Sequence, residues 1–534
     1  MKKKKTKFLA LVLICTMAVA LLAACSPQAD PVATGDATTP GAEITPGTET
    51  APTAAQPGRT LYIAVSNSFG TLHPHGVVGA AGFIPIMRSL YDALFTFRQD
   101  GTMEMLLVEE IEEISEIQYI FHLRRGVTFS NGNPFTAHDI YFTMNYVRDH
   151  PRLNSEVRHV CFDNTRVIDD YTFELWLTHF DVGAFHGFVT MYVLNAASYD
   201  ADYLAYNPIG TGPYRVVDFV IGSHLILEVR DDFWGPRPAV ERIHFRILEE
   251  PAQRVNAIQT GIVHHASIPV RDIDFVESLG YSILQVNNAV AMGVFFNLTP
   301  GELLGTLAAR EAIMHAINRE AIHRIAFDGL GVIAPWPTSS ANVDFEPRFA
   351  GMHPVYTAAG YDPERARALA EQEGLIGQTL RIITNGDPTW VAVAEIIQHN
   401  LSAIDINTQI INFDPGTYWA MMADESSFEI AIQVIAAPQP LALRHMNSYP
   451  RFFSQGWDNP DRDRYLELGT QGMGTADDAA RAEILYEMLQ IFMRNKPWFN
   501  LVDTVSVEAL SPELSVIARD IDGSLRFKHW QWAE

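Results

Sequence analysis

Few residues in this sequence have the types and spacing of a recognised catalytic motif. The patterns G-x-S-x-G, H-E-x-x-H, C-x-x-C and G-x-x-x-x-G-K-[ST] are all absent. His73 and His75 flank a proline instead of lying four residues apart on a helix, so packing within a loop is favoured over metal binding. Carboxylates are numerous, but none forms an obvious pair for glycoside hydrolysis. We therefore predict no catalytic residue, no metal centre and no cofactor.

Two other stretches resemble ligand-binding motifs only in part. Residues 329–334 spell the glycine pattern G-x-G-x-x-A, but they follow a predicted helix and no helix comes after them. Asp520, Asp522 and Gly523 begin like a calcium loop, but the remaining ligands do not follow. Residues 329–334 are therefore predicted to be a loop, and no calcium site is predicted at 520–523.

Aromatic residues near predicted loop–element junctions are more informative. Rings contribute contact area at low entropy cost, which suits the binding of a small peptide or sugar. Packing in the core is the competing interpretation for each ring, so only some are expected to line a binding cleft. The set is Phe69, Trp336, Trp390, Trp419 and Trp457.

Composition limits the class of protein. The chain has 534 residues, of which 11% are aromatic, so two or three domains with substantial cores are expected. Its formal charge is −25, which repels phosphate backbones and argues against nucleic-acid binding. Three cysteines, Cys15, Cys25 and Cys161, are too few for a disulfide framework.

The amino-terminal segment has the pattern of an export signal. A basic stretch to Lys7 precedes the apolar run 8–22, and Leu22-Ala23-Ala24-Cys25 resembles a bacterial lipobox. An uncleaved membrane anchor is the alternative, but the run is short for a full span. We predict a signal peptide at 1–24, a lipid on Cys25 and an extracytoplasmic, membrane-anchored protein. Residues 25–58 lack aromatic and basic residues, which predicts a disordered tether.

The rest of the chain has an α/β pattern. A corner at 207–214 precedes two alternating runs that predict a hairpin, and 307–327 is predicted to be one helix. Strand-loop-helix repeats follow from 380 onward, and their crossings imply a cleft between two lobes. The predicted domains are a discontinuous first domain (59–99, 205–288 and 501–534), an inserted subdomain (100–204) and a second lobe (289–500).

Five motifs then carry a family resemblance. They cover most of the folded body in order: Thr71–His75, Phe121–Asp139, Asn207–Tyr214, Arg310–Ile322 and Tyr361–Ala366. They resemble signatures of the extracytoplasmic solute-binding proteins of family 5, which serve peptide/nickel-type ABC importers. The resemblance implies a two-lobed, three-domain periplasmic-binding-protein-like fold of type II, with a hinge and an interlobe ligand cleft.

The resemblance also implies positions for ligand-contacting residues. Peptide binders of the family usually carry an aspartate after the corresponding strand of the third domain, whereas 435–440 of this chain contains no carboxylate. His73 likewise replaces a family aspartate. By position, the expected ligand-binding residues are Ser68, Phe69, Trp390, Ala437, Gln439 and, as an anion partner, Arg444.

The predicted function is capture of a small solute, most simply an oligopeptide or peptide-like compound, and its delivery to ABC permease subunits. A monomer attached to the membrane through lipid alone is expected. Nickel chelates and oligosaccharides remain alternative ligands, and a sensor lipoprotein is an alternative role. A secreted hydrolase is disfavoured by the missing motifs.

Overall fold

The structure is a computed structural model, and everything below concerns the residues that it describes. These are 60–66, 70–76, 83–98, 102–150, 156–342, 344–357, 360–422, 427–435, 441–444, 446–447, 457–520 and 523–533. Only the backbone is described at 287–289, 415–416 and 435. The predicted signal peptide, Cys25 and the tether lie outside these ranges.

One large mixed sheet organises the described body. It has eleven strands in the order β15-β14-β16-β12-β17-β11-β1-β10-β9-β8, and β13 pairs with β17 beside this path. The bounds are β1 Thr60–Val65, β8 Tyr214–Val220, β9 His224–Val229, β10 Arg242–Ile247, β11 His265–Ser267, β12 Ser282–Phe296, β13 Val332–Ile333, β14 Thr379–Thr384, β15 Asn407–Asn412, β16 Ile430–Ile435 and β17 Trp498–Leu510.

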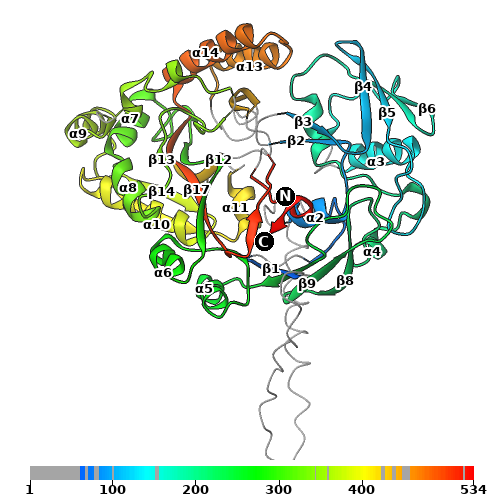
Figure 1. The fold of residues 1–534 in the computed structure, drawn as a ribbon. Coiled ribbons are helices and arrows are strands. Elements are labelled where there is room, and N and C mark those ends of the chain that lie inside the picture. Colours follow the sequence, from blue (N-terminus) through cyan, green and yellow to red (C-terminus); the bar gives the residue numbers. More distant parts are fainter. Residues whose placement is uncertain are drawn as a thin grey trace, which may run out of the picture. The chain divides into compact units, whose positions relative to one another are not determined.

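β12 and β17 are the longest strands, with 15 and 13 residues. They pair antiparallel along nearly their whole length, from Ser282 opposite Leu510 to Phe295 opposite Trp498 (Figure 1). One half of the pair is joined to β11, and the other half is joined to β16. Polar residues do not end β12 early, because Gln285 and Asn287 pair with Val507 and Val505 of β17.

The corner at 207–214 packs against the end of helix α2 (Ile84–Leu90). A Cβ atom at Gly210 would lie 2.1 Å from the carbonyl oxygen of Leu90, and one at Gly212 would lie 2.6 Å from the carbonyl carbon of Leu90. No larger residue fits this close approach. Arg230 then donates to the carbonyl oxygens of both glycines, and β8 and β9 form the predicted hairpin. The motif therefore serves the fold.

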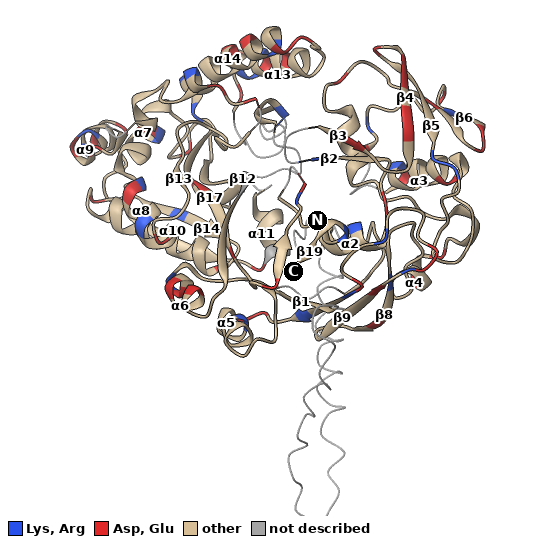
Figure 2. Ribbon diagram, in the orientation of Figure 1, with Lys and Arg blue, Asp and Glu red and all other residues tan. Residues whose placement is uncertain are grey.

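A second sheet, in the order β4-β5-β7-β6, has its own apolar core. Helix α3 (Ala137–Asp149) begins with a capping box, in which Thr136 and Asp139 bond reciprocally. Figure 2 shows the acidic outer strand β4, which alternates glutamate pairs with single isoleucines. The strands of this part are β2 Phe95–Phe97, β3 Met103–Met105, β4 Val108–Ser115, β5 Gln118–Leu123, β6 Arg166–Asp169 and β7 Thr172–Trp176.

The largest core lies around the β12, β14, β16 and β17 end of the main sheet. The prediction of a single helix at 307–327 was wrong, because the chain extends at Ile317 and Asn318 and begins a new helix there. The Asn318 side chain accepts a hydrogen bond from the amide of Ala321, and this cap outweighs the continuous apolar pattern. The helices are α7 Leu307–Ala316, α8 Arg319–Ala326, α9 Pro363–Gln372, α10 Pro388–Ser402, α11 Pro415–Met422, α13 Pro460–Met473 and α14 Asp478–Asn495.

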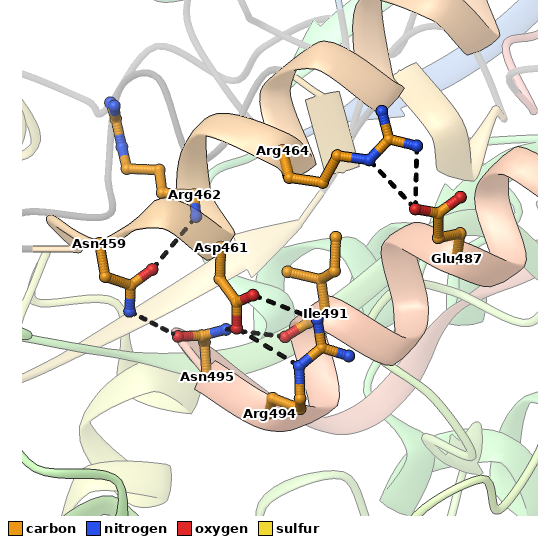
Figure 3. Close-up of polar contacts among 8 residues, drawn as sticks. All are labelled: Asn459, Asp461, Arg462, Arg464, Glu487, Ile491, Arg494 and Asn495. Atoms are coloured by element: carbon orange, nitrogen blue, oxygen red, sulfur yellow. Dashed lines mark hydrogen bonds and ion pairs between the residues drawn. The ribbon is translucent and has the colours of Figure 1, made fainter.

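Helices α13 and α14 form a pair held at its surface by polar contacts (Figure 3). Asp461 accepts from Arg494 and Asn495, and Arg464 donates to Glu487. Exposed ion pairs of this kind contribute about 0–1 kcal/mol each, so apolar packing carries most of the stability. The remaining described elements are α4 Ala201–Leu204, α5 Pro251–Gln259, α6 Ile273–Ser278, β18 Leu514–Val516 and β19 Gln531–Trp532.

Among the described helices, we find none with the length and apolar character that a membrane crossing requires.

Candidate functional site

The strand directions locate a candidate site at the middle of β12 and β17. β1 runs parallel to β11, which is antiparallel to β17, so the chain beyond Val65 is directed toward residues 504–506. β16 runs the opposite way and ends with Ile435 opposite Ala291. The carboxyl ends of β1 and β16 therefore converge on the same stretch of sheet. Ligands of open α/β sheets bind beyond the carboxyl ends of strands.

This middle stretch differs from the rest of both strands. The pairing of β12 with β17 shifts register between Asn287 and Val290 and again between Met292 and Gly293. Residues 504–506 are half-buried, whereas every other residue of β17 is buried. The pairing is thus interrupted where the strand ends meet, as expected for a hinge that also faces a bound molecule.

Three polar residues share one face of the sheet beside this stretch. Gly293 pairs with Gln433 on one side and Asn500 on the other, and Ala291, two residues before it, pairs with Asp503. Because directly paired residues and alternate residues of a strand share a face, Gln433, Asn500 and Asp503 lie together. We call these three residues the polar face.

Gly293 allows the polar face to pack closely against β12. A Cβ atom at this position would lie 2.8 Å from both Asn500 Oδ1 and the Phe499 carbonyl oxygen. Any larger residue would therefore displace the Asn500 amide or the strand.

The polar face is fully buried, and several of its atoms have no partner. Gln433, Asn500 and Asp503 are each 0% exposed. Within the described part of the chain, Gln433 Nε2, both amide atoms of Asn500 and Asp503 Oδ1 make no hydrogen bond. Each such atom costs about 1–3 kcal/mol, so groups of this kind in native proteins usually contact water or a ligand.

Asp503 carries the charge of the polar face. Its Oδ2 accepts hydrogen bonds from the Ser340 hydroxyl and from the Ser340 amide, the latter at 2.7 Å. Burial raises the pKa of Asp503 to about 6, although the bonds from Ser340 act in the opposite direction. A positive group beside Oδ1 would lower that pKa and stabilise the carboxylate.

The segment of residues 337–342 and Asp344 lies beside the first half of β17, from Trp498 to Asp503. Trp498 Nε1 donates to the Pro337 carbonyl oxygen at 2.7 Å. At its other end, Asp344 accepts hydrogen bonds from the amides of Ala442 and Leu443 at 2.7 and 3.0 Å. Thr338 and Asn342 of this segment are also buried, with unpartnered side-chain atoms. Further unpartnered hydrogen-bonding groups, on Thr338 and Asn342, therefore lie in the same segment as Ser340.

Arg444, predicted as an anion partner, directly follows Leu443 in the chain, and its side chain reaches Gly183. Its Nη1 atom lies 3.4 Å from the position of a Cβ on Gly183, and Val182 donates to the Met473 carbonyl oxygen at 2.8 Å. Burial lowers the pKa of Arg444 to about 10, and the charges of Asp181 and Glu156 oppose that shift. Arg444 and Met473 thus lie against residues 182–183, which follow the four-stranded sheet in the chain.

Trp390 lies in the first turn of α10, directly beyond the carboxyl end of β14. Asp387 caps this helix by accepting from the amides of Thr389 and Trp390. The indole is 8% exposed and meets Tyr418 edge to face at 5.6 Å. Ser68, Phe69, Ala437 and Gln439 lie outside the described residues, so ligand contact by these residues and by Trp390 stays a prediction.

Two of the aromatic candidates are core residues. Trp336 is 0% exposed and stacks on Phe349, and Trp457 is 3% exposed and packs on Tyr465. Trp419 is 50% exposed. Packing therefore accounts for Trp336 and Trp457.

The histidine and glycine motifs have structural roles. His73 Nδ1 accepts from the His75 amide, and His75 Nε2 contacts the Tyr192 carbonyl oxygen at 2.9 Å. Residues 332–333 form β13 rather than a loop, because Gly331, with φ of +83°, brings them beside β17. Asp520 forms ion pairs with Arg88 and Arg526.

Among the described residues, one cluster places three metal-type ligand atoms within 4.8 Å of one another, those of His159, His179 and Asp181. Arg158 Nε lies 2.8 Å from His159 Nε2 and donates to it. This hydrogen bond occupies the lone pair that a metal would need.

The polar face was missed from the sequence. A signal existed, because Gln433 interrupts an apolar strand and Asn500 and Asp503 interrupt another. A polar residue inside such a run must find a partner. Their common location depends on pairing between β12 and β17, which lie about 200 residues apart.

Comparisons with known proteins match most of this chain. The family model described as bacterial extracellular solute-binding proteins, family 5 Middle, matches residues 102–458. The glutathione-binding protein GsiB of Pectobacterium atrosepticum is 22% identical over 483 residues, which cover 85% of this chain and 90% of that protein.

Two solved structures share the fold. NikA from Brucella suis, in complex with Fe(III)-EDTA, has a TM-score of 0.77 and 20% identity and covers 89% of this chain and 100% of its own. The periplasmic binding protein DppA from Helicobacter pylori, in complex with the peptide STSA, has a TM-score of 0.75 and 19% identity, covering 89% and 98%. The predicted two-lobed, periplasmic-binding-protein-like fold is confirmed.

Proposed function

Because the chain belongs to the bacterial extracellular solute-binding proteins of family 5, we propose that it captures an oligopeptide or a peptide-like compound for an ABC importer. The observation that carries this proposal is the polar face beside the converging ends of β1 and β16. Its unpartnered amide and carboxylate atoms match the donors and acceptors of a peptide backbone. The glutathione-binding relatives support the same ligand class, since glutathione is a peptide.

The contact around Arg444 supports capture between two lobes. A solute held at the middle of β12 and β17 is enclosed when the second lobe meets the inserted unit, as in hinge closure around ligands. Ser68, Phe69, Trp390, Ala437 and Gln439 then complete the enclosure from the strand ends. The domain boundaries predicted from the sequence are part of this proposal.

A lipid on Cys25 and the tether at 25–58 would hold this receptor outside the cytoplasmic membrane, close to its permease. The relatives named above are binding proteins, not enzymes, and we propose that this chain performs no chemistry on its solute. Replacement of Cys25 by alanine should release the protein from the membrane fraction while leaving ligand affinity unchanged. Retention of the Cys25→Ala protein in that fraction would contradict the lipid anchor.

The proposal is tested by thermal unfolding of the full-length chain in mild detergent against panels of peptides, oligosaccharides and nickel chelates. A ligand at a hundred times its Kd stabilises a protein by about 2.7 kcal/mol. We expect peptides to raise the Tm. Stabilisation by sugars or chelates alone would contradict the peptide assignment, and turnover of any panel member would contradict a pure binding role.

A further inference from the structure

The most unusual group in the described structure for a binding protein is the half-paired carboxylate of Asp503. Both hydrogen bonds from Ser340 go to Oδ2, while Oδ1 has no partner and the residue is 0% exposed. A buried charge without a counter-ion is unfavourable unless a partner arrives. The carboxylate is held through Oδ2, and its Oδ1 is covered without a hydrogen-bond partner.

Two other acids near this half of the sheet, the buried Glu429 and the partly buried Asp344, have partners on both carboxylate oxygens. Glu429 binds Arg381 through both oxygens, at 2.6 and 3.0 Å. Asp344 accepts one backbone amide on each oxygen. The free oxygen of Asp503 is therefore not a general feature of buried acids in this lobe.

The neighbours of Asp503 on the polar face are neutral. Gln433 Nε2 is a donor, and the Asn500 amide offers a donor and an acceptor. The residues after β16, Ala436 to Pro440, supply no carboxylate. Asp387, beyond β14, is already engaged as a helix cap. Asp503 is thus the acid that the described residues leave available beside the converging strand ends.

We infer that Asp503 binds a cationic ammonium group of the solute, and that Asn500 and Gln433 pair with the amide groups next to it. The ligand class is a peptide or peptide-like compound with a free amino group. This inference rests on the proposed function and deepens it, because it names the group that the site requires. Water could fill the same space, and the experiment separates the two.

The test uses native mass spectrometry of the full-length chain with two pools of tetrapeptides, one with free amino termini and one N-acetylated. Acetylation removes the positive charge and leaves the backbone amides. The wild-type chain should bind the free pool more tightly by roughly 30-fold, the loss that follows removal of one partner of a buried charge pair. Asp503→Asn, which keeps the shape and can still accept from Ser340, should abolish this preference.

The matched control is Glu508→Gln, on the same strand, which should keep the preference for the free pool. Thermal unfolding of each variant verifies that it is folded. Equal binding of the two pools by the wild-type chain would overturn the inference without any variant and would leave the proposed function standing. So would an undiminished preference in Asp503→Asn, which would mean that Oδ1 meets water only. Absence of binding to both pools would instead contradict the peptide function itself.

Discussion

Strand β17 carries two buried acids five residues apart whose surroundings are opposite in kind. Glu508 lies in the half joined to β11, where its oxygens meet His265 at 2.6 Å, Arg519 and Ser506. Asp503 lies in the half joined to β13 and β12, where Ser340 alone binds it. Both carboxylate oxygens of Glu508 have partners within the protein, whereas Oδ1 of Asp503 has no hydrogen-bond partner. The difference separates a carboxylate that stabilises the protein from one that is available to a ligand.

The pKa values express the same contrast. Burial alone would raise the pKa of both acids. The charges and hydrogen bonds of His265 and Arg519 instead lower the pKa of Glu508 to about 2, whereas Asp503, which lacks a cation, stays at about 6. Replacing each acid by its amide should therefore change stability in opposite directions.

The largest effect is expected for Glu508→Gln. Removing one partner of a buried pair costs about 3–5 kcal/mol, because His265 and Arg519 lose their counter-charge. Since the folded pKa of Glu508 is depressed, its contribution is present above about pH 4.5 and is lost as the pH falls toward 2. Denaturant unfolding at pH 7 and pH 3 measures this. A cost below 1 kcal/mol at pH 7 would contradict the structural role of Glu508.

Asp503→Asn should stabilise the empty protein at pH 8. A folded pKa near 6, against an ordinary value near 4, corresponds to about 2–3 kcal/mol of strain in the ionised form. The sign is opposite to that of Glu508: the strain is present above pH 6 and disappears as the pH falls through 6 toward 4. Urea unfolding at pH 8 and pH 4 tests this. Destabilisation at pH 8 would mean that Asp503 has a counter-ion.

The two serines give the smallest and sharpest comparison. Ser340→Ala removes a hydroxyl donor from a carboxylate with few others, so about 1–2 kcal/mol should be lost at pH 8. Ser506 contacts Glu508 Oε1 at the longer distance of 3.4 Å, so losing this contact should cost less than losing the Ser340 hydroxyl. Parallel chemical denaturation of both variants gives the difference directly. Equal costs would show that Asp503 and Glu508 are paired alike.

Local sequence chemistry predicted much of the fold. The glycines of the corner at 207–214 act within a few residues, so the turn they make could be predicted. The capping box at Thr136 and the helix start at Asp362 and Pro363 depend on equally local contacts. The break at Asn318 was missed because the apolar pattern continues through it.

The candidate site was less predictable, because it is assembled by pairing between distant strands. The sequence did indicate that the loops after β1, β14 and β16 carry candidate ligand-binding residues. The polar face was not, since Gln433, Asn500 and Asp503 come together only through the register of β12 with β16 and β17. Trp336 and Trp457 were candidates for a binding cleft but are buried in the core, because an aromatic ring near a loop can also pack inward.

The most direct test of the central claim is a crystal structure of the chain with a bound tetrapeptide. The account predicts the peptide beside the middle of β12 and β17, with its amino group within hydrogen-bond distance of Asp503 Oδ1 and its amides on Asn500 and Gln433. A peptide bound elsewhere, with ordered water alone on the polar face, would contradict it.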